Sequence, residues 1–244
     1  MSTLTIRVGR SFPAGKARRA GSLAIPLRPK IGYVPGMAMV KICGLTDPDL
    51  VAFAAREGAD WVGLNFIPVS PRYVTPEAAE TLLMSVGRAI PVALLADPDD
   101  AEVRRIAALG FPAIQLHGAE TPERLAEVKA MTGREVWKAV GVSGAADLAL
   151  AAGYTAADRL LIDAKAPEGS GQGGGHGAVF DWTLLQGWAP PKPWFLAGGL
   201  TPLNVAEAIR LTGAVAVDVS SGVERVRGLK DRELVRAFLR AAKG

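Results

Sequence analysis

The sequence contains very little of the side-chain chemistry that binds metals or forms disulfides. Its 244 residues include one cysteine, Cys43, and two histidines, His117 and His176. A single cysteine cannot form an intramolecular disulfide, and no second thiol is present to share a four-ligand zinc or iron–sulfur site. We therefore expect a cytoplasmic chain that works without a metal or another cofactor.

Long hydrophobic runs are also missing. The longest stretches without a charged residue, Ile106–Ala119 and Pro193–Ala206, have 14 residues each, and Gly and Pro interrupt both. A membrane-spanning helix needs about 18 or more apolar residues, so the sequence predicts no membrane partner. Apolar residues make up 49% of the chain and charged residues 21%, which is typical of a globular domain with a large core. The length suits an α/β barrel that closes as one domain.

Acidic residues are absent from the first 38 residues, which hold seven basic ones. The other 206 residues carry 21 basic and 24 acidic side chains, so the net charge of +4 comes from this leader. Four prolines interrupt any amphipathic helix there. We interpret residues 1–38 as a disordered basic extension, with a targeting segment as the alternative, and assign residues 39–244 to one folded domain.

From Val40 onward, short apolar runs alternate with helical stretches. The runs are continuously apolar, which indicates strands buried on both faces, as in parallel sheets with helical crossovers. Eight strand–helix units in about 200 residues predict a single (βα)8 TIM barrel. The pairs are Val40–Cys43 with Asp47–Glu57, Asp60–Phe66 with Pro76–Arg88, Val92–Leu95 with Asp99–Leu109, Ala113–Leu116 with Pro122–Met131, Val136–Val140 with Ala145–Ala152, Arg159–Asp163 with Asp181–Gln186, Trp194–Ala197 with Pro202–Leu211, and Val215–Val219 with Asp231–Lys243.

An open doubly wound sheet is the alternative fold. Its dinucleotide-binding form would need a glycine-rich fingerprint directly after the first strand, where this chain has only Cys43-Gly44-Leu45-Thr46. The glycine cluster lies instead at Gly169–Gly177, after the sixth strand. The barrel is therefore favoured, and its chemistry should gather at the carboxyl ends of the strands.

The last two strands end in segments suited to holding a phosphate. Gly198-Gly199 and Ser220-Ser221-Gly222 can offer backbone N–H groups without side-chain obstruction, as phosphate sites of barrels do. Either glycine segment alone could simply turn the chain. Both together predict a small phosphorylated substrate.

Several short motifs along the chain together resemble those of one enzyme family. In chain order, motifs spread over nearly all of residues 40–244 resemble those of phosphoribosylanthranilate isomerases, the tryptophan-pathway barrel enzymes. The motifs are Val40-Lys41-Ile42-Cys43-Gly44, Ser70-Pro71-Arg72-Tyr73, Gln115-Leu116-His117-Gly118, Lys138-Ala139-Val140-Gly141-Val142, Leu161-Ile162-Asp163, Phe180-Asp181-Trp182, Ala197-Gly198-Gly199-Leu200 and Asp218-Val219-Ser220-Ser221-Gly222-Val223-Glu224.

The resemblance implies a reaction and a set of roles. The family performs an Amadori rearrangement of N-(5-phosphoribosyl)anthranilate to the 1-deoxyribulose isomer without metal or cofactor. It implies Cys43 as general base, Asp163 as general acid and Arg72 as the residue that binds the anthranilate carboxylate. A solvated loop arginine is the alternative for Arg72, and a monomer or a homodimer is the expected assembly.

The chemistry sets conditions on these groups. Cys43 must be partly thiolate, and Lys41, two residues back on the same strand face, is a candidate to favour that form. Pairing of Lys41 with an acid such as Asp218 on the eighth strand is an equally good interpretation. Asp163 must keep its proton near neutral pH, which requires a water-poor site that raises its pKa.

Two further features stay open. Gln115 and His117 share one face at a strand end and are placed behind the substrate-contacting residues. The loop 167–179 departs from the family pattern because it is longer and carries six glycines among residues 169–177. We expect it to act as a flexible lid, and we assign no role to His176.

Two other functions compete with this one. The histidine-pathway isomerase performs the same chemistry on an aminoimidazole carboxamide ribotide, but it resembles a two-aspartate site, and Cys43 argues against it; an enzyme acting on both substrates is a variant of this alternative. A non-enzymatic binder with a basic tail is the other, but no basic stripe on the body supports a nucleic-acid partner.

Overall fold

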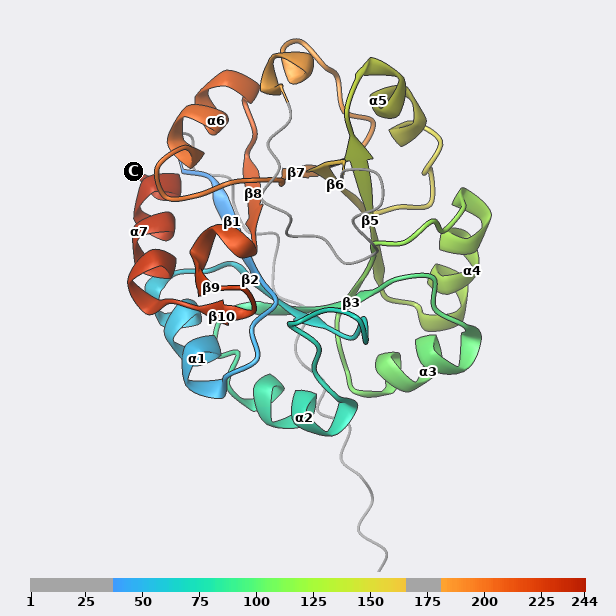
Figure 1. Cartoon of the computed structure of the whole chain (residues 1–244). Helices are drawn as coiled ribbons and strands as arrows, with labels where there is room; N and C mark the ends of the chain where they lie inside the picture. The colour runs from blue at the N-terminus through green and yellow to red at the C-terminus, as the bar shows by residue number, and fades with distance from the viewer. Residues whose placement is uncertain (1–36, 166–180) are drawn as a thin grey trace, which may run out of the picture.

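The computed structural model of the chain describes residues 37–165 and 181–244. Its centre is a closed barrel of eight parallel strands that follow one another in chain order (Figure 1). The predicted (βα)8 fold is therefore confirmed. The strands are β1 (Met39–Cys43), β2 (Trp61–Asn65), β3 (Ile90–Leu95), β4 (Ala113–Leu116), β5 (Glu135–Val142), β6 (Arg159–Ala164), β7 (Trp194–Leu196) and β8 (Ala216–Val219).

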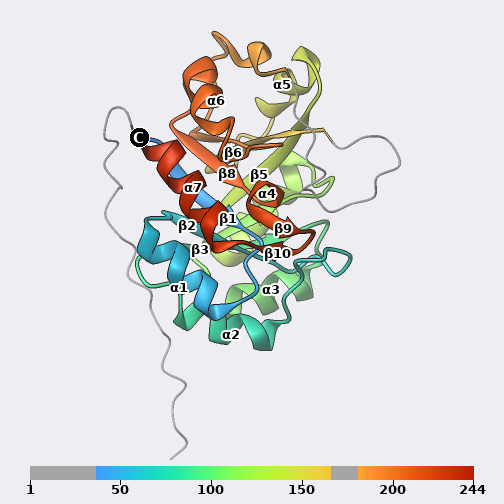
Figure 2. The ribbon, with the colours of Figure 1, turned by 60° about the vertical axis from the view of Figure 1, so that its left-hand side comes forward.

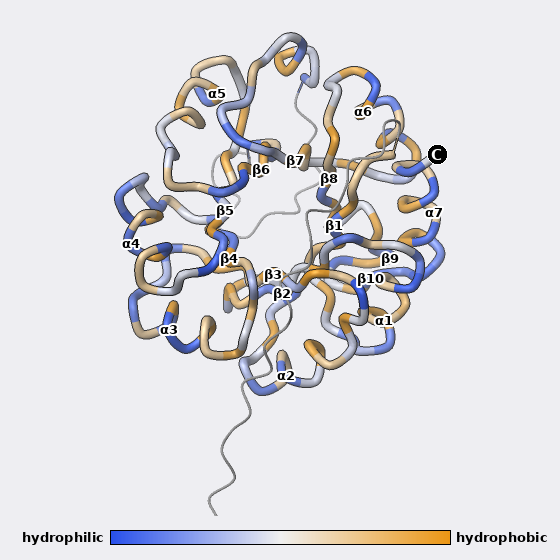
Figure 3. The backbone as a smooth tube through the Cα atoms, turned by 180° about the vertical axis from the view of Figure 1, so that it is seen from behind, coloured by the Kyte–Doolittle hydropathy of each residue, from blue (hydrophilic) through white to orange (hydrophobic). Residues whose placement is uncertain are grey.

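Helices surround the barrel. They are α1 (Pro48–Glu57), α2 (Pro76–Met84), α3 (Asp100–Ala108), α4 (Pro122–Thr132), α5 (Ala145–Ala151), α6 (Val205–Thr212) and α7 (Arg232–Lys243), with short 3₁₀ helices η1 (Trp182–Leu185) and η2 (Ser221–Val223). Their hydrophilic residues, as in α3, α4 and α7, lie on the outer ring (Figure 3). The predictions for residues 1–36 and for the lid at Gly169–Gly177, including His176, lie outside the described residues.

Helix starts follow the capping signals in the sequence. Asp47, Thr75 and Thr121 each accept a backbone N–H with the side chain, and a proline follows each of them at the first helical turn. Proline suits this place because its missing N–H would have no partner there. Where the chain has both signals, the predicted start is correct for α2 and α4 and one residue early for α1.

Two helix boundaries differ from the prediction by more than one residue. Helix α6 begins at Val205 instead of Pro202, because the Asn204 side chain accepts the N–H of Thr201 at 2.7 Å and holds residues 201–204 in a turn. Helix α2 ends at Met84 instead of Arg88, and the chain turns through Ser85–Ala89 before β3.

The barrel packs around two separate cores. The larger one fills the space between the strands and the helices, where residues such as Val40 and Ile42 are fully buried. The smaller one fills the inside of the barrel. Its amino-terminal end is closed by three rings, Trp61, Trp137 and Phe195, whose centroids lie 5.0 to 5.9 Å apart. This end is packed with side chains, so the polar groups are left to the carboxyl end.

An element that the pattern did not predict lies at that end. The two short strands β9 (Glu224–Val226) and β10 (Leu229–Lys230) form an antiparallel hairpin between η2 and α7. Figure 2 shows the hairpin on the side of the barrel where the loop after β2 projects. Gly228 contacts Pro71 of that loop so closely that an added Cβ would lie 3.0 Å from the Pro71 carbonyl oxygen.

Among the helices of the described ranges, none has the length and apolar character to cross a membrane.

Candidate active site

Cys43 ends strand β1 and points into the barrel interior, where it is 6% exposed. Glycine in the neighbouring strand makes room for it: Cys43 pairs in register with Gly63, and a Cβ on Gly63 would lie 3.0 Å from the Cys43 sulfur. Any larger residue at position 63 would press on the thiol. The sequence therefore fixes both the place and the direction of this side chain.

Lys41 lies below Cys43 on the same inward face and is fully buried. Its ammonium group contacts Asp218 of β8 at 2.8 Å, and the two residues pair in register. The predicted pairing of Lys41 with Asp218 is thus confirmed. The pair is neutral as a whole, which limits the electrostatic help that Lys41 can give to a thiolate.

Burial raises the pKa of the Cys43 thiol above its ordinary value, because the charged form loses its hydration. Lys41 and Lys230 oppose this effect, and Asp218 adds to it. The nearby cations lower the pKa of Cys43, as expected, but burial raises it by more. The thiol is mostly protonated at neutral pH.

Asp163 lies near the carboxyl end of β6, which is separated from β1 by β7 and β8 in the closed barrel. Desolvation, with a smaller contribution from Asp218, raises its pKa to about 7, against a lowering by the Ala164 backbone and Lys41. The predicted condition for a general acid is therefore met. Asp218 and Lys41 influence both Asp163 and Cys43, so the two groups face the same interior space.

Gly198 is part of the same arrangement. Its φ is +84°, and a Cβ there would collide with the backbone nitrogen of Ala164 and lie 2.9 Å from a carboxylate oxygen of Asp163. The end of β7 can approach Asp163 because residue 198 lacks a side chain. Gly198 therefore shapes the site of the carboxyl group as well as the loop that was predicted to hold phosphate.

Gln115 and His117 of the fourth strand–helix unit form a pair behind Asp163. The amide nitrogen of Gln115 lies 3.2 Å from His117 Nδ1, and His117 Nε2 lies 3.7 Å from an Asp163 oxygen. Burial and the charge of Lys138 lower the pKa of His117 to about 4. The ring is neutral at pH 7, so its contact with Asp163 is a dipolar one and not an ion pair. Gln115 Oε1 is buried without a partner among the described residues.

Arg72 in the loop after β2 is only 2% exposed, so it is not a solvated loop arginine. Its Nε and Nη2 donate to the two carboxylate oxygens of Glu224 at 2.6 and 2.9 Å. This uses one edge of the guanidinium and leaves the edge formed by Nη1 and Nη2 for another carboxylate. Gly44 leaves room for the arginine side chain, because a Cβ on Gly44 would lie 2.5 Å from Arg72 Cδ.

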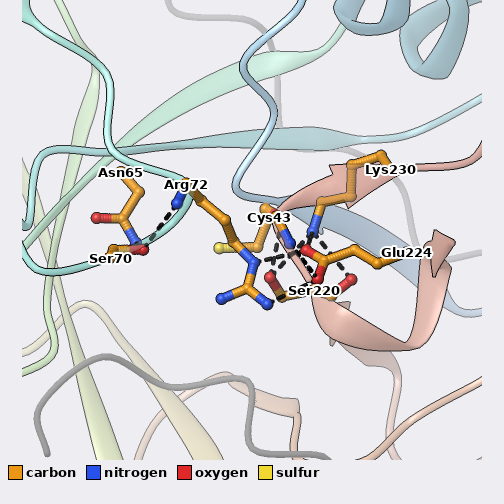
Figure 4. Close-up of polar contacts among 8 residues, drawn as sticks. Cys43, Asn65, Ser70, Arg72, Ser220, Glu224 and Lys230 are labelled. Atoms are coloured by element: carbon orange, nitrogen blue, oxygen red, sulfur yellow. Dashed lines mark hydrogen bonds and ion pairs between the residues drawn. The ribbon is translucent and has the colours of Figure 1, made fainter. Parts of the chain in front are cut away.

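Glu224 and Lys230 of the hairpin complete this part of the site (Figure 4). Lys230 donates to Glu224 at 2.7 Å, to the Ser220 carbonyl at 2.9 Å and to the Ser220 hydroxyl at 3.1 Å. The Ser220 hydroxyl donates in turn to the carbonyl of Cys43 at 3.2 Å. The pattern of strands and helices did not indicate these two residues. Glu224 ends the last of the motifs that carry the family resemblance, but no role was assigned to it, and Lys230 is in none of those motifs.

Another buried ion pair joins Lys138 in β5 to Glu120 in the loop after β4. Lys138 contacts Glu120 at 2.8 Å and the Gly118 carbonyl at 2.6 Å. The other carboxylate oxygen of Glu120 accepts the N–H groups of Asp97 and Gly118 at 2.8 and 3.1 Å. Asp97 has a φ of +49°, which a non-glycine residue seldom adopts. Glu120 therefore fixes the turns after two neighbouring strands.

The glycine segments after β7 and β8 lie on adjacent strands. Asn204 donates to the Gly199 carbonyl at 3.0 Å and so fixes the turn. A Cβ on Gly222 would collide with the Leu200 carbonyl, so the two segments contact each other through Gly222. Ser221 begins η2, and the N–H groups of Gly199 and Ser221 make no backbone hydrogen bond to another described residue. They are free to bind an anion.

Side chains able to hold a metal ion do not gather in this site. Within residues 37–165 and 181–244, no group of three or more His, Cys, Asp or Glu side chains is arranged to bind one. The chemistry that the described groups offer is proton transfer at Cys43 and Asp163, cation contact at Arg72, and anion binding at backbone N–H groups.

Comparison with known proteins shows the family of the chain. Residues 40–241 match the family described as N-(5′-phosphoribosyl)anthranilate (PRA) isomerase. The N-(5′-phosphoribosyl)anthranilate isomerase of Hyphomonas neptunium is 67% identical over 207 residues, covering 85% of this chain and 98% of its own. That of Paramagnetospirillum magneticum is 52% identical over 208 residues, covering 84% and 97%.

Solved structures agree. The phosphoribosyl anthranilate isomerase of Thermotoga maritima superposes with a TM-score of 0.76 at 35% identity, covering 84% of this chain and 98% of that one. A phosphoribosyl anthranilate isomerase in complex with reduced 1-(o-carboxyphenylamino)-1-deoxyribulose 5-phosphate has a TM-score of 0.74 at 33% identity, with the same coverage.

Proposed function

The chain belongs to the N-(5′-phosphoribosyl)anthranilate isomerase family, and from this membership we propose how its residues carry out the reaction. The activity is the isomerisation of N-(5-phosphoribosyl)anthranilate to 1-(2-carboxyphenylamino)-1-deoxyribulose 5-phosphate in tryptophan biosynthesis. We propose Cys43 as the general base and Asp163 as the general acid.

Asp163 begins the reaction. Its proton moves to the ring oxygen of the ribose, the bond from that oxygen to C1′ breaks, and the anthranilate nitrogen forms a double bond to C1′. A carboxyl group with a pKa of about 7 is half protonated at neutral pH, which suits this donation. This pKa, in a group that faces the same interior as Cys43, is the observation that supports the proposal best.

Cys43 acts on the next carbon. Its thiolate removes the proton from C2′, the electrons of the C–H bond form a C1′–C2′ double bond, and the nitrogen regains its lone pair. The resulting enolamine becomes the ketone product. Because burial leaves only a minor fraction of the thiol ionised, the reactive enzyme combines a neutral Asp163 with a Cys43 thiolate and is a minority form.

The remaining predicted residues orient the substrate. The free edge of Arg72 is placed to take the anthranilate carboxylate, while Glu224 holds the opposite edge. The backbone N–H groups of Gly198, Gly199, Ser221 and Gly222 are proposed to bind the phosphate. Ser220 belongs to the same set through its backbone N–H, while its hydroxyl bonds Lys230 and the Cys43 carbonyl.

Lys41, Gln115 and His117 are proposed to act without touching the substrate. Lys41 balances Asp218, and the Gln115–His117 pair lies behind the Asp163 carboxyl group. We also propose a cytoplasmic enzyme that is a monomer or a homodimer; one solved relative is described as monomers made from a dimeric Thermotoga maritima enzyme. As domain organisation we propose a basic extension at residues 1–38 ahead of a catalytic barrel at residues 39–244.

The test follows loss of the fluorescent anthranilate conjugate with the wild type, Cys43→Ser and Asp163→Asn. Each substitution removes one proton transfer, so kcat should fall by about 10² or more while circular dichroism stays that of the folded barrel. A folded variant with near-normal kcat would overturn the role given to that residue. Lys129→Met, on the outside of the barrel, is the control and should keep wild-type kcat.

A further inference from the structure

Three charged residues form a buried cluster beside Cys43 that the acid–base pair does not explain. We call Arg72, Glu224 and Lys230 the mouth triad. Their side chains are 2 to 4% exposed, and the single carboxylate of Glu224 contacts both cations, at 2.6 Å to Arg72 and 2.7 Å to Lys230. The triad therefore carries a net charge of +1 in a place that water hardly reaches. A buried net positive charge destabilises the folded protein unless an anion lies nearby to compensate it.

Lys230 is the member that hydrogen bonds link, through Ser220, to the backbone of Cys43. All three of its N–H donors are engaged, with Glu224, the Ser220 carbonyl and the Ser220 hydroxyl. The same hydroxyl donates to the Cys43 carbonyl, so one Ser220 side chain joins the ammonium group to the backbone of the base. Lys230 consequently has a single fixed position next to Cys43 (Figure 4). Its charge lowers the pKa of Cys43. Burial lowers the pKa of Lys230 itself, and Glu224 and a Cys43 thiolate act against this lowering.

The other charges near Cys43 and Lys230 are joined in ion pairs. Lys41 and Asp218 act on Cys43 with opposite signs and are joined at 2.8 Å as a neutral pair. Arg72 and Glu224 form a two-point ion pair that is also neutral. Lys230 is thus the cation whose charge is left over. In the enzyme without substrate, before a carboxylate binds Arg72, a thiolate at Cys43 is the anion that would balance it.

We propose that Lys230, held by Glu224 and Ser220, is a positioning residue that stabilises the thiolate form of Cys43. The proposal rests on the proposed function only in treating Cys43 as the base. It assigns the hairpin β9–β10 a task in the reaction, because the hairpin brings Lys230 back over the end of β1. It also makes Glu224 the residue that sets how much positive charge the thiol experiences.

The test uses the fact that Cys43 is the only cysteine, so ultraviolet thiolate absorbance and the rate of alkylation by iodoacetamide report on this residue alone. Lys230→Met should raise the thiol pKa and slow alkylation at pH 7.5 by about tenfold, which corresponds to about one pKa unit. Lys230→Arg keeps the charge and should titrate close to wild type. Glu224→Gln leaves two cations without their carboxylate, so it should shift the thiol pKa downward and speed alkylation.

Opposite shifts in these two variants are a result that damage to the structure does not produce. Lys129→Met is the matched control, because Lys129 also contacts one carboxylate and one carbonyl, at 2.7 and 3.2 Å, but on the outside of the barrel. Its thiol titration should equal that of the wild type. If Lys230→Met folds and titrates like the wild type, or if Glu224→Gln does not lower the thiol pKa, the proposal is wrong.

Lys230→Met does not have to fold for the test to work, because Glu224→Gln and Lys230→Arg then decide it with the same measurement. The readout does not depend on turnover. An active Cys43→Ser enzyme would refute the base assignment and leave the thiol titration unaffected, so failure of this proposal and failure of the proposed function are distinguishable.

Discussion

At Asp163, burial serves the reaction and opposes folding. The same desolvation that raises its pKa to about 7 makes the ionised form costly in the folded chain. An unfolded chain would ionise this carboxyl near its ordinary pKa. The folded protein therefore binds a proton that the unfolded protein releases between about pH 4 and 7, and its stability falls as pH rises through that window.

Asp163→Asn should consequently be more stable than the wild type. At pH 8 we expect a gain in unfolding free energy of about 2–4 kcal/mol, because asparagine has no charge to bury, and a clearly smaller gain at pH 5. Urea unfolding at the two pH values measures it. A variant that is less stable than the wild type at pH 8 would show that the ionised Asp163 is well accommodated and not strained by burial.

At the scale of elements, the sequence predicts what local signals determine. Capping residues, continuous apolar runs and the spacing of strands gave the eight units and the strand ends that carry Cys43 and Asp163, whereas Arg72 was identified through the family resemblance. The β9–β10 hairpin was missed because its strands have three and two residues, too short for any periodicity. Its partners Arg72 and Glu224 are 152 residues apart, and only the closed barrel brings them together. The expectation for the pKa of Cys43 was wrong for the same reason, because this pKa depends on burial of the thiol by the whole fold.

The turn after β1 gives an element-scale prediction. Gly44 and Gly213 have φ values of +74° and +67°, but only Gly44 has a neighbour, Arg72, in the path of a Cβ. Gly213→Ala should cost about 1–2 kcal/mol of stability from its backbone conformation and leave KM unchanged. Gly44→Ala should cost at least as much and also raise KM severalfold, because Arg72 must move. Equal KM values for the two folded variants would mean that Arg72 does not bind substrate.

The loops after β3 and β4 depend on the buried pair of Glu120 and Lys138. Lys138→Met leaves the buried carboxylate of Glu120 without its ion-pair partner, so we expect the unfolding free energy to fall by about 3–5 kcal/mol. Adding Glu120→Gln removes that charge and should restore part of the stability. Thermal denaturation of the single and double variants measures this coupling. If the double variant is no more stable than Lys138→Met, the loss comes from packing and not from the stranded carboxylate.

At the scale of the whole molecule, the barrel separates stability from chemistry. Its amino-terminal end is closed by the Trp61, Trp137 and Phe195 rings, over which the Arg159 guanidinium lies 5.4 to 5.6 Å from the two tryptophans. The opposite end carries the acid, the base and the triad. Every proposed site residue lies between Lys41 and Lys230, inside the matched range 40–241.

Removal of residues 1–36 should therefore leave the enzyme intact. The barrel begins with Met39, whose N–H donates to Val215 at 2.9 Å, and a chain that starts at Met37 keeps this bond. We expect kcat/KM within about twofold of the full chain in the fluorescence assay. A large loss would assign the basic segment a part in catalysis, and salt-sensitive binding to nucleic acid or anionic vesicles that disappears with it would support the tailed-binder alternative.

The pH dependence of kcat/KM tests the acid–base pair most directly. If Asp163 titrates near pH 7 and Cys43 well above it, the reactive form with a neutral acid and a thiolate is a constant minority between the two pKa values. The profile should rise to about pH 7, stay flat, and fall only at the pKa that thiolate absorbance gives for Cys43. A profile that already falls from pH 7, or an alkaline limb unrelated to the Cys43 titration, would contradict the account.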